Sequence, residues 1–516
     1  MFWADKIAGE IIDSGRHKPY RVDDMKTPSG RVHVGALRGV VVHDLVYKAL
    51  KNKEVDVKFT YVFEDHDPMD DIPSYLSRER FEKYLGMPLF SIPSPEEGYE
   101  NYARFYAGEF EKVFRAIGCE PEIIWTKDLY TSGKMNPVIK EILDQASEVR
   151  KIYEEIYDKK LSANWYPFQI YCPNCGKVST TEISDWDGEH VTYKCMIDKV
   201  PWTKGCGEKG KISPFSSEKG IVGKLSWKVD WPVKWKAIGV TIEGAGKDHM
   251  SAGGSHDVAE EICERILNYP VPYPIAYEWI LVGGRKMSSS RGVGVAASEM
   301  LDILPPELIR FLIVRIKVNT QINFDPSDSL TIPNLFDEYQ KAADAYFSRS
   351  DSGGNKKDKD LARIFELSQI GEVKKPPKVR FAVLTQWVQM PNMEDEIKKE
   401  SLDDWAKYAK IWLERYAPEE QKFEVKKVLP QAVELLSSEQ KKLLLEISKL
   451  LDQKWDAAVF QTKVYDLGKE LGLPSHKTFE AIYKALLGKH HGPKAAWLIL
   501  SLDPKFVRQR FEEASR

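Results

Sequence analysis

The 516-residue sequence lacks an apolar run long enough to cross a bilayer, and its first residues lack the continuous apolar segment and small-residue cleavage site of an export signal. It also lacks a strong excess of either charge, because the formal net charge is only −3. We therefore expect a cytoplasmic protein with no membrane partner. Without a general polyanion-binding coat, any nucleic-acid binding must depend on local basic faces and on shape.

Cysteine is scarce as well, with six residues, of which four lie between Cys172 and Cys206. This clustering predicts a metal site in a reducing compartment rather than a disulfide framework. Cys172 and Cys175 form a C-x2-C knuckle, and Cys195 and Cys206 complete an all-thiolate set typical of one structural zinc ion. The second pair is separated by ten residues instead of two, so free cytosolic thiols remain the alternative.

Residues 25–63 show one half of a Rossmann-like unit. Turn residues come first, and then Leu37, Val41 and Leu45 recur at every fourth position, which predicts an amphipathic helix. Residues 55–63 alternate between apolar and mostly polar side chains, which predicts a strand. The chain length predicts several domains.

The alternation of helix and strand patterns is then interrupted and later resumes. Residues 65–225 contain a Pro-rich segment, helical stretches and the cysteine cluster, whereas short β-rich runs ending in glycine reappear at 238–244 and 274–284. We therefore predict an α/β fold with a Rossmann-type domain, residues 1–64 and 226–299, that is split by a zinc-bearing insertion, residues 65–225.

The remainder of the chain is predicted to be helical. Residues 300–347 include a helix that opens with prolines, which suit a helix start. Residues 348–516 begin with a Ser-, Gly- and Lys-rich linker and continue as a separate all-α domain. Within it, Ser437 and Gln440 have the spacing of a capping box.

A phosphate-binding turn is predicted at PSGRVHVGA, residues 28–36, directly before the amphipathic helix. The amino terminus of a helix presents free N–H groups and a partial positive charge. Gly30 and Gly35 permit close backbone approach by a ligand, and His33 can donate a hydrogen bond to a phosphate oxygen. Taken alone, the motif also fits an ordinary capped turn, so it needs a partner.

That partner is GGRKMSSSRG, residues 283–292, on the loop after the last predicted strand. Lys286 supplies a compact cation for phosphate, and Ser288 and Ser289 supply hydroxyl and backbone donors. A solvated loop of ordinary composition is the alternative for this segment alone.

Together the two motifs resemble the HIGH and KMSKS signatures of class I aminoacyl-tRNA synthetases. The resemblance implies that both motifs hold ATP, with Mg²⁺ on its phosphates, while the amino-acid carboxylate attacks the α-phosphate. It makes His33 and Lys286 the catalytic candidates and places Gly246 and Asp248 at the same crevice. The ATP-binding residues that it implies are Gly30, His33, Gly35, Gly246, Asp248, Lys286, Met287, Ser288 and Ser289.

Two positions depart from those signatures. Ala36 stands where HIGH has its second histidine, and Ser289 stands where KMSKS has its second lysine. The side-chain roles of the family therefore do not carry over to these two positions. Arg285 or Arg291 is a candidate to compensate for the missing lysine.

Further segments resemble the class I lysyl-tRNA synthetases over nearly the whole chain, among them LSWKVDWPVKW, EGAGKDHMSAGGSHDVAEEI and HHGPKAAW. A lysine substrate needs an apolar wall for its aliphatic stem and a carboxylate or a π face for its ammonium. Trp227, Asp230 and Trp231 offer that combination, although such tryptophans are equally typical of a core or a domain interface. The lysine-binding residues that the resemblance implies are Ser29, Gly30, Trp227, Asp230, Trp231, His249 and Tyr277.

Two further segments bear on the substrate and on metals. The acidic run from Glu64 to Asp71 follows a predicted strand, where its carboxylates either meet the substrate ammonium or are simply solvated. The family can hold a second metal in the insertion, but the corresponding residues 94–106 contain no histidine or cysteine, so we expect a single zinc ion.

The same resemblance makes residues 300–347 a stem-contact segment and residues 348–516 an anticodon-binding domain, with tRNA(Lys), L-lysine and ATP as partners and a monomer favoured. Basic and aromatic residues interleave at 405–416, which suits phosphate contact and base stacking but equally describes a solvated helix face. Two other functions stay open. One is a class I synthetase for another amino acid such as glutamate, which would need a cationic recognition group, and the other is a zinc-ribbon nucleic-acid-binding protein without catalysis.

Overall fold

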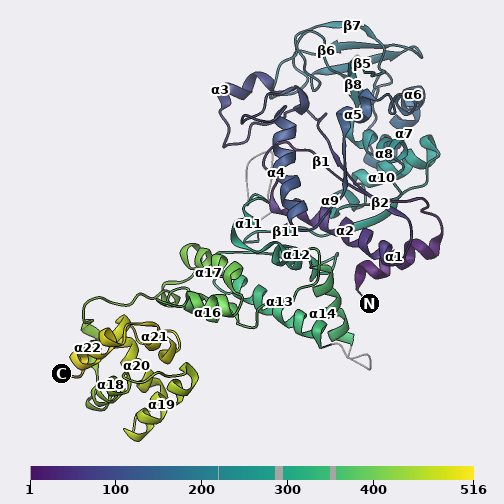
Figure 1. Cartoon of the computed structure of the whole chain (residues 1–516). Coiled ribbons are helices and arrows are strands. Elements are labelled where there is room, and N and C mark those ends of the chain that lie inside the picture. The colour runs from purple at the N-terminus through teal and green to yellow at the C-terminus, as the bar shows by residue number, and fades with distance from the viewer. Residues whose placement is uncertain (1, 219, 285–294, 349–355) are drawn as a thin grey trace. The chain divides into compact units, whose positions relative to one another are not determined.

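The computed structural model describes residues 2–218, 220–284, 295–348 and 356–516. The chain divides into two compact units (Figure 1). The first comprises residues 1–325 and 344–374, and the second comprises residues 326–343 and 375–516. No helix within the described residues is both long enough and apolar enough to cross a membrane.

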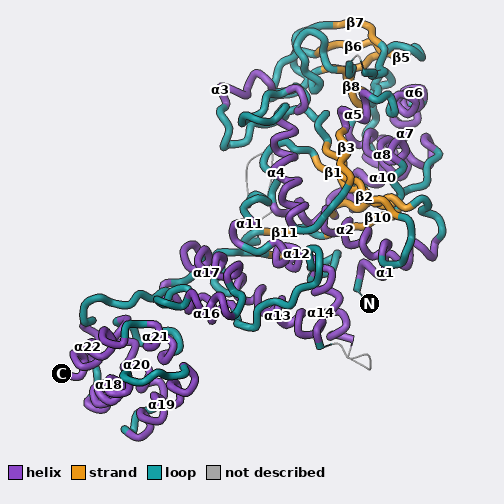
Figure 2. The backbone as a smooth tube through the Cα atoms, viewed as in Figure 1, coloured by secondary structure: helices purple, strands orange, loops and turns teal. Residues whose placement is uncertain are grey.

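A five-stranded, fully parallel sheet forms the centre of the first unit (Figure 2). Its strands are β1 Tyr20–Lys26, β2 Val57–Phe63, β3 Glu122–Trp125, β9 Ile242–Gly246 and β10 Tyr273–Tyr277. Their spatial order is β10-β9-β1-β2-β3, so the direction of strand succession reverses between β1 and β9. In open α/β sheets, a ligand crevice forms outside the carboxyl ends of the strands at such a point.

Helix α2, Leu37–Lys51, packs against this sheet and is buried over most of its length. The predicted apolar stripe is present, but the polar residues between its members are buried too, including Arg38 and His43. The terminal nitrogens of Arg38 bind backbone carbonyl groups, and its Nη2 donates to the carbonyl oxygens of Lys317 at 2.7 Å and Val318 at 3.2 Å. The helices α1 Trp3–Ser14 and α12 Pro306–Val314 also pack against α2.

The chain between β2 and β9 contributes β3 to the central sheet and also builds smaller elements of its own. One is a three-stranded antiparallel sheet of β5 Thr181–Trp186, β6 Val191–Cys195 and β7 Lys209–Ile212, and another pairs β4 Phe168–Ile170 with β8 Gly223–Leu225. The helices that precede β4 in this stretch are α3 Arg78–Phe81, α4 Tyr102–Ala116, α5 Thr126–Thr131, α6 Asn136–Asp144 and α7 Ala146–Tyr157.

The rest of the first unit comprises α8 before β9 and further elements after β9 in the sequence. Its elements are α8 Trp227–Ile238, α9 Lys247–Met250, α10 Ser255–Ile262, α11 Met300–Ile303, α14 Lys356–Leu367 and the paired strands β11 Ile280–Leu281 and β12 Ile322–Asn323. The predicted α/β fold, interrupted by a segment with the cysteine cluster and followed by a helical unit, is confirmed.

The second unit contains helices and no strand within its described residues. The Ser437 hydroxyl oxygen accepts a hydrogen bond from the Gln440 N–H, and the Gln440 side-chain oxygen accepts one from the Ser437 N–H, so the predicted capping box is confirmed. Its helices are α15 Phe381–Trp387, α16 Glu394–Lys399, α17 Asp403–Arg415, α18 Ser438–Leu450, α19 Ala457–Glu470, α20 Ser475–Leu487, α21 Ala495–Ser501 and α22 Pro504–Ser515. Helix α13, Thr331–Phe347, begins in this unit and ends in the first one.

Candidate active site

A cavity of about 490 Å³ opens at the carboxyl ends of β1, β9 and β10, where the strand order reverses. Its lining joins segments that are more than 200 residues apart in the sequence. The sequence-predicted residues that line it are His33, Gly35, Trp227, Trp231, Gly246, Asp248, His249 and Tyr277. The predicted residues Ser29, Gly30 and Asp230 do not line it.

The glycine- and histidine-containing turn lies between β1 and α2. His33 has an extended backbone and precedes a short 3-10 turn, Val34–Ala36, that leads directly into α2. The turn is held from the side by two tyrosines: Tyr102 donates its hydroxyl hydrogen to the Ser29 carbonyl at 2.9 Å, and Tyr75 accepts a hydrogen bond from the Arg31 N–H at 2.6 Å. Ser29 therefore contributes to the position of the turn through its backbone.

The backbone on either side of the predicted second motif is anchored near this turn. The Val34 N–H donates to the Val295 carbonyl at 3.0 Å, and the Ala297 N–H donates to the Val32 carbonyl at 2.8 Å. On the other side, the Gly284 N–H donates to the Asn323 side-chain oxygen at 2.9 Å. Lys286, Met287, Ser288 and Ser289 lie outside the described residues, as do Arg285 and Arg291.

The turn after β9 forms the opposite side of the cavity. Gly246 leads into α9, and a Cβ atom added to this glycine would lie 2.9 Å from a carboxylate oxygen of Asp248. Lys247 forms an ion pair with Glu278 at 2.8 Å, and its Nζ lies 4.5 Å from the centre of the Trp279 ring. His249 Nδ1 is 2.9 Å from the Ser255 hydroxyl oxygen. The turn is therefore fixed by several polar contacts around a position that favours glycine.

Helix α8 supplies an aromatic wall. The ring of Trp227 is 47% exposed and lies 5.7 Å from the ring of His249, centre to centre. Trp231 is buried, and its indole N–H donates to Glu243 at 2.8 Å, while the indole of Trp235 donates to the other oxygen of the same carboxylate. The wall therefore combines one exposed tryptophan with two tryptophans that hold a buried carboxylate.

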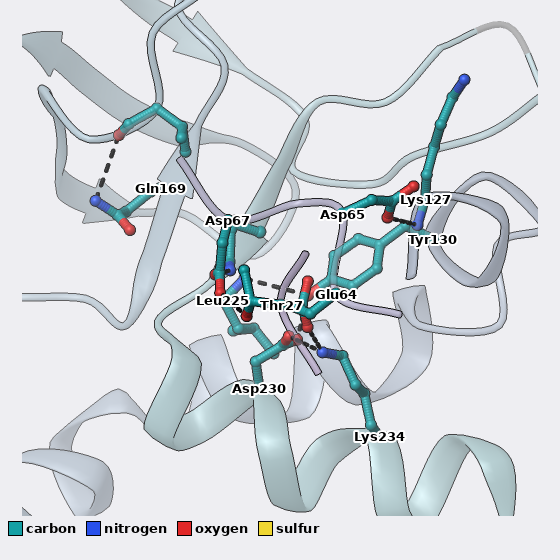
Figure 3. A network of polar contacts seen from close by, with 12 residues as sticks. Thr27, Glu64, Asp65, Asp67, Lys127, Tyr130, Gln169, Leu225, Asp230 and Lys234 are labelled. Atoms are coloured by element: carbon teal, nitrogen blue, oxygen red, sulfur yellow. Dashed lines mark hydrogen bonds and ion pairs between the residues drawn. The ribbon is translucent and has the colours of Figure 1, made fainter. Parts of the chain in front are cut away.

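Asp230 lies on the same helix and belongs to a buried polar network (Figure 3), in which Glu64 and Lys234 also line the cavity. Its carboxylate accepts a hydrogen bond from the Tyr130 hydroxyl at 2.5 Å and lies 2.7 Å from the Lys234 ammonium. Lys234 also pairs with Glu64, so one buried cation serves two carboxylates. Burial raises the pKa of Asp230 to about 7 and lowers that of Lys234 to about 7.

Part of the predicted acidic run belongs to this interior, and part of it is solvated. Glu64 and Asp65 are buried, and burial raises the pKa of Asp65 to about 7, whereas Asp70 and Asp71 are exposed. Asp67 pairs with Lys224 and accepts a hydrogen bond from the Thr27 hydroxyl at 2.7 Å. The solvated interpretation therefore holds for Asp70 and Asp71, whereas Glu64 and Asp67 pair with lysines of the protein itself.

Sequence reasoning missed several groups of the crevice, notably Asp24, Lys234 and Glu243. The adjacent acids Asp23 and Asp24, shortly before the glycine turn, were an available signal. Asp230 and Lys234, four positions apart on a helix, were another.

The crevice has an excess of buried negative groups. The buried carboxyl residues around it are Asp23, Asp24, Glu64, Asp65, Asp230 and Glu243, whereas the buried ammonium residues are Lys224 and Lys234. Desolvation raises the pKa of every one of these carboxyl groups for which a shift is resolved, as at Asp24, where the value rises to about 7. A cationic ligand would relieve this excess, whereas an anionic one would add to it.

The four predicted cysteines come together in a second site beside the three-stranded sheet. Their sulfur atoms all lie within 4.8 Å of one another, with 3.5 Å between Cys172 and Cys206 and 3.7 Å between Cys175 and Cys195. Zinc–sulfur bonds of about 2.3 Å in a tetrahedron place the sulfurs roughly 3.8 Å apart. The thiol arrangement therefore fits a closed, four-coordinate zinc site.

Comparison with known families gives two matches. A family described as tRNA synthetases class I (K) matches residues 1–371, and an anticodon binding domain matches residues 392–515. The first match covers all the elements that form the crevice and the cysteine cluster.

Full-length relatives agree with these matches. A lysine–tRNA ligase of Methanosarcina barkeri (strain Fusaro) is 35% identical over 550 residues, covering 100% of this chain and 98% of the relative. A lysine–tRNA ligase of Archaeoglobus fulgidus is 33% identical over 531 residues, covering 100% of both chains. Among solved structures, a glutamate tRNA ligase of Elizabethkingia meningosepticum is 13% identical with a TM-score of 0.46, covering 96% of this chain and 99% of that one.

Proposed function

The chain belongs to the class I tRNA synthetases of the lysine type, and on this premise we propose that the cavity beside β1 and β9 is where lysine is activated. The protein is a lysine–tRNA ligase, whose substrates are lysine, ATP and tRNA(Lys). One observation carries the assignment of the site: the backbone around His33 pairs with residues 295–297, directly beside the cavity. The described residues that follow the second motif in the sequence are thereby held beside the first motif.

The proposed chemistry is adenylate formation by positioning and charge stabilisation. An oxygen of the lysine carboxylate forms a bond to the α-phosphorus of ATP. The bond from that phosphorus to the bridging oxygen breaks, and pyrophosphate leaves with the electron pair and with the Mg²⁺ that its phosphates hold. The amino-terminal end of the α2 segment and the His33 side chain would stabilise the negative charge that develops on the phosphate oxygens.

The ATP-binding residues proposed are those of the two motifs and of the turn after β9. His33 and Gly35 line the cavity on one side, and Gly246 and Asp248 line it on the other. Gly30 would act by shaping the first turn. Lys286, Met287, Ser288 and Ser289 complete the set, with Lys286 as the cation that offsets charge on the phosphates, as the family resemblance implies.

The amino-acid side of the site is proposed to be the aromatic half of the cavity. Trp227, Trp231, His249 and Tyr277 all line it, and such faces suit the aliphatic stem of lysine. The excess of buried carboxylates suits the ammonium of lysine and opposes the carboxylate of glutamate. Asp230, whose carboxylate is already held by Tyr130 and Lys234, would act by positioning rather than by contact.

The cysteine cluster is proposed to hold one structural Zn²⁺, bound by Cys172, Cys175, Cys195 and Cys206. Bound zinc would supply the cross-link that holds the turns around β5, β6 and β7 together. Gly205 supports this packing, because a Cβ atom at that position would lie 2.2 Å from the Met196 carbonyl oxygen and 2.8 Å from the Cys195 sulfur.

The remaining assignments concern the tRNA and the state of the enzyme. Residues 392–515 match an anticodon binding domain, and we propose that the whole range 348–516 serves anticodon recognition while residues 300–347 contact the stem. The ranges 1–64, 65–225 and 226–299 are proposed as the two catalytic halves and the insertion between them. A monomeric cytoplasmic enzyme completes the proposal.

The test is isotope exchange between ATP and pyrophosphate with each amino acid in turn, with and without tRNA. We expect exchange that depends on lysine and that falls about 100-fold or more in Lys286→Ala, because a stabilising group at the reacting phosphate is lost. The matched control is Lys53→Ala, which removes an exposed lysine after α2 and should leave exchange unchanged. Exchange that depends on another amino acid, or an unaffected Lys286→Ala enzyme, would contradict the proposal.

A further inference from the structure

Most carboxylates that line the cavity already have donors from the protein. Glu64 pairs with Lys234, and Asp67 pairs with Lys224 and Thr27. Donors that are supplied by the chain reduce the capacity of a carboxylate to bind a substrate cation, because its lone pairs and its charge are already in use.

Two more carboxylates are engaged on the β9 side of the cavity. Both oxygens of Glu243 accept indole N–H groups, one from Trp231 at 2.8 Å and one from Trp235. Asp248 lies on α9 with one oxygen 3.4 Å from the Trp279 indole nitrogen. Asp24 is therefore the cavity carboxylate that calls for a different explanation.

Asp24 has little protein support. Its Oδ1 accepts one hydrogen bond, from the Met25 N–H at 2.9 Å. Within the described part of the chain, no lysine or arginine nitrogen lies within 4.0 Å of the Asp24 carboxylate as an ion pair. Lys26, two positions along β1, interacts with it electrostatically only at longer range. Burial without a counter-charge raises the pKa of Asp24 to about 7.

His43 does not provide the missing charge, although its Nδ1 lies 3.7 Å from Asp24 Oδ2. The Gly244 N–H points to His43 Nε2 at 2.7 Å, so this nitrogen must be the acceptor and carries no proton. Nδ1 then carries the proton, and it lies 2.7 Å from the Gly39 carbonyl oxygen, to which it donates. Burial lowers the pKa of His43 to about 4, in agreement with a neutral ring.

A second oxygen points to the same space as Asp24. A Cβ atom built on Gly39 would lie 2.8 Å from Asp24 Oδ2 and 2.8 Å from the Tyr277 hydroxyl oxygen. The two oxygens therefore converge over a stretch of helix that has no side chain. The Tyr277 hydroxyl makes no hydrogen bond to any of the described residues, so its lone pairs are available.

We propose that Asp24, together with the Tyr277 hydroxyl, receives the side-chain ammonium of the lysine substrate, and that Gly39 keeps the space between them open. The proposal rests on the function proposed above and extends it. An ammonium group needs oxygen acceptors and an opposite charge, and the Asp24 carboxylate and the Tyr277 hydroxyl supply both. An aromatic ring beside them can contact the aliphatic stem of lysine. The specificity for lysine then comes from a carboxylate that the protein itself leaves without a cation.

The test compares lysine with norleucine, which keeps the aliphatic stem but has no side-chain ammonium. Lysine-dependent exchange gives the KM for lysine, and competition gives the inhibition constant of norleucine. In Asp24→Asn we expect the KM for lysine to rise about 100-fold or more, because a buried charge partner is lost, while norleucine binds within about twofold of its affinity for the wild type. The matched control is Asp70→Asn, an exposed carboxylate, which should change neither constant.

Further variants keep the test decisive if Asp24→Asn fails to fold. Tyr277→Phe removes only the hydroxyl group and should raise the KM for lysine about tenfold with little effect on norleucine. A KM for lysine within twofold of the wild-type value in the folded variants would overturn the inference and leave the proposed function intact. A wild-type enzyme without lysine-dependent exchange would overturn the proposed function itself.

Discussion

Asp230 and Asp24 are both deeply buried in the first unit, and in both cases burial raises the pKa to about 7. Their surroundings differ. Asp230 has a hydroxyl donor and the ammonium of Lys234, whereas Asp24 has a single backbone N–H and a neutral histidine. Burial alone therefore does not distinguish a structural carboxylate from one that binds a ligand. The distinguishing property is whether the chain supplies the counter-charge.

The cysteine cluster extends this comparison to groups that depend on an external cation. Four thiolates within 4.8 Å of one another repel strongly unless a metal ion lies between them. The largest effect that we expect is therefore the loss of zinc. Apparent binding free energies of structural zinc reach about 10–16 kcal/mol in small zinc folds, so Cys195→Ser should unfold the β5–β7 region instead of merely weakening it.

Metal analysis and hydrogen exchange would measure this effect. We expect the bound zinc to fall from one ion per chain to none and the amides of β5, β6 and β7 to lose protection. The matched control is Cys263→Ala, because Cys263 is buried outside the cluster and should leave the zinc content unchanged. Full zinc content in Cys195→Ser would show that the cluster is not the metal site.

The second-largest effect that we expect concerns the buried ion pairs around Asp230. Lys234→Met removes the buried cation that pairs with Glu64 and Asp230, and it leaves both buried carboxylates without that counter-charge. We expect the free energy of unfolding of the first unit to fall by about 3–5 kcal/mol. Urea denaturation at neutral pH measures it. Lys236→Met, in the same helix, removes a partly exposed ion pair with Glu141 and should cost no more than about 1 kcal/mol.

The smallest effect that we expect is the pH dependence of lysine binding, which depends on the charge of Asp24. The raised pKa of Asp24, about 7, means that its binding-competent charged form declines as the pH falls below that value. The other titratable groups facing it are Asp23, Lys26, His43, Tyr61, Glu243 and Tyr277. His43, with a pKa of about 4, stays neutral through this range.

Calorimetric titration measures this dependence directly. The dissociation constant for lysine should be nearly constant above pH 8 and rise toward tenfold per pH unit below pH 7, because free lysine keeps its side-chain charge throughout. Norleucine should show no such rise, and Asp24→Asn should give a flat, weak profile. A wild-type profile that stays flat down to pH 5.5 would mean that Asp24 does not bind the ammonium.

Sequence reasoning found the residues whose roles are marked by local spacing. The C-x2-C knuckle and the pair Cys195 and Cys206 were predicted as one cluster, and their sulfurs meet. His33 and Gly35 were predicted at a turn before a helix, and they line the cavity. For the C-x2-C knuckle and for the turn, the relevant geometry is set within a few residues, so that the spacing in the sequence carries the information.

The roles of the carboxylates could not be predicted in the same way. Asp230 was chosen because it stands among tryptophans, but its charge is satisfied by Lys234, which comes one turn later on the same helix. Asp24 was missed because its significance depends on what is absent around it. His43, Gly39 and Tyr277 surround Asp24 without supplying a cation. Tyr277 and the Gly244 N–H, which fixes the neutral form of His43, come from the other half of the sheet.

Gly39 has a consequence for how the protein can change by mutation. Every other amino acid would place at least a Cβ atom between Asp24 and Tyr277, so that this position admits no substitution without displacing one of the two oxygens. A library scan of α2 that selects for growth should therefore register position 39 as intolerant, whereas a scan that selects only for soluble protein should register it as permissive. The disagreement between the two scans would identify a residue that is retained for the substrate and not for the helix.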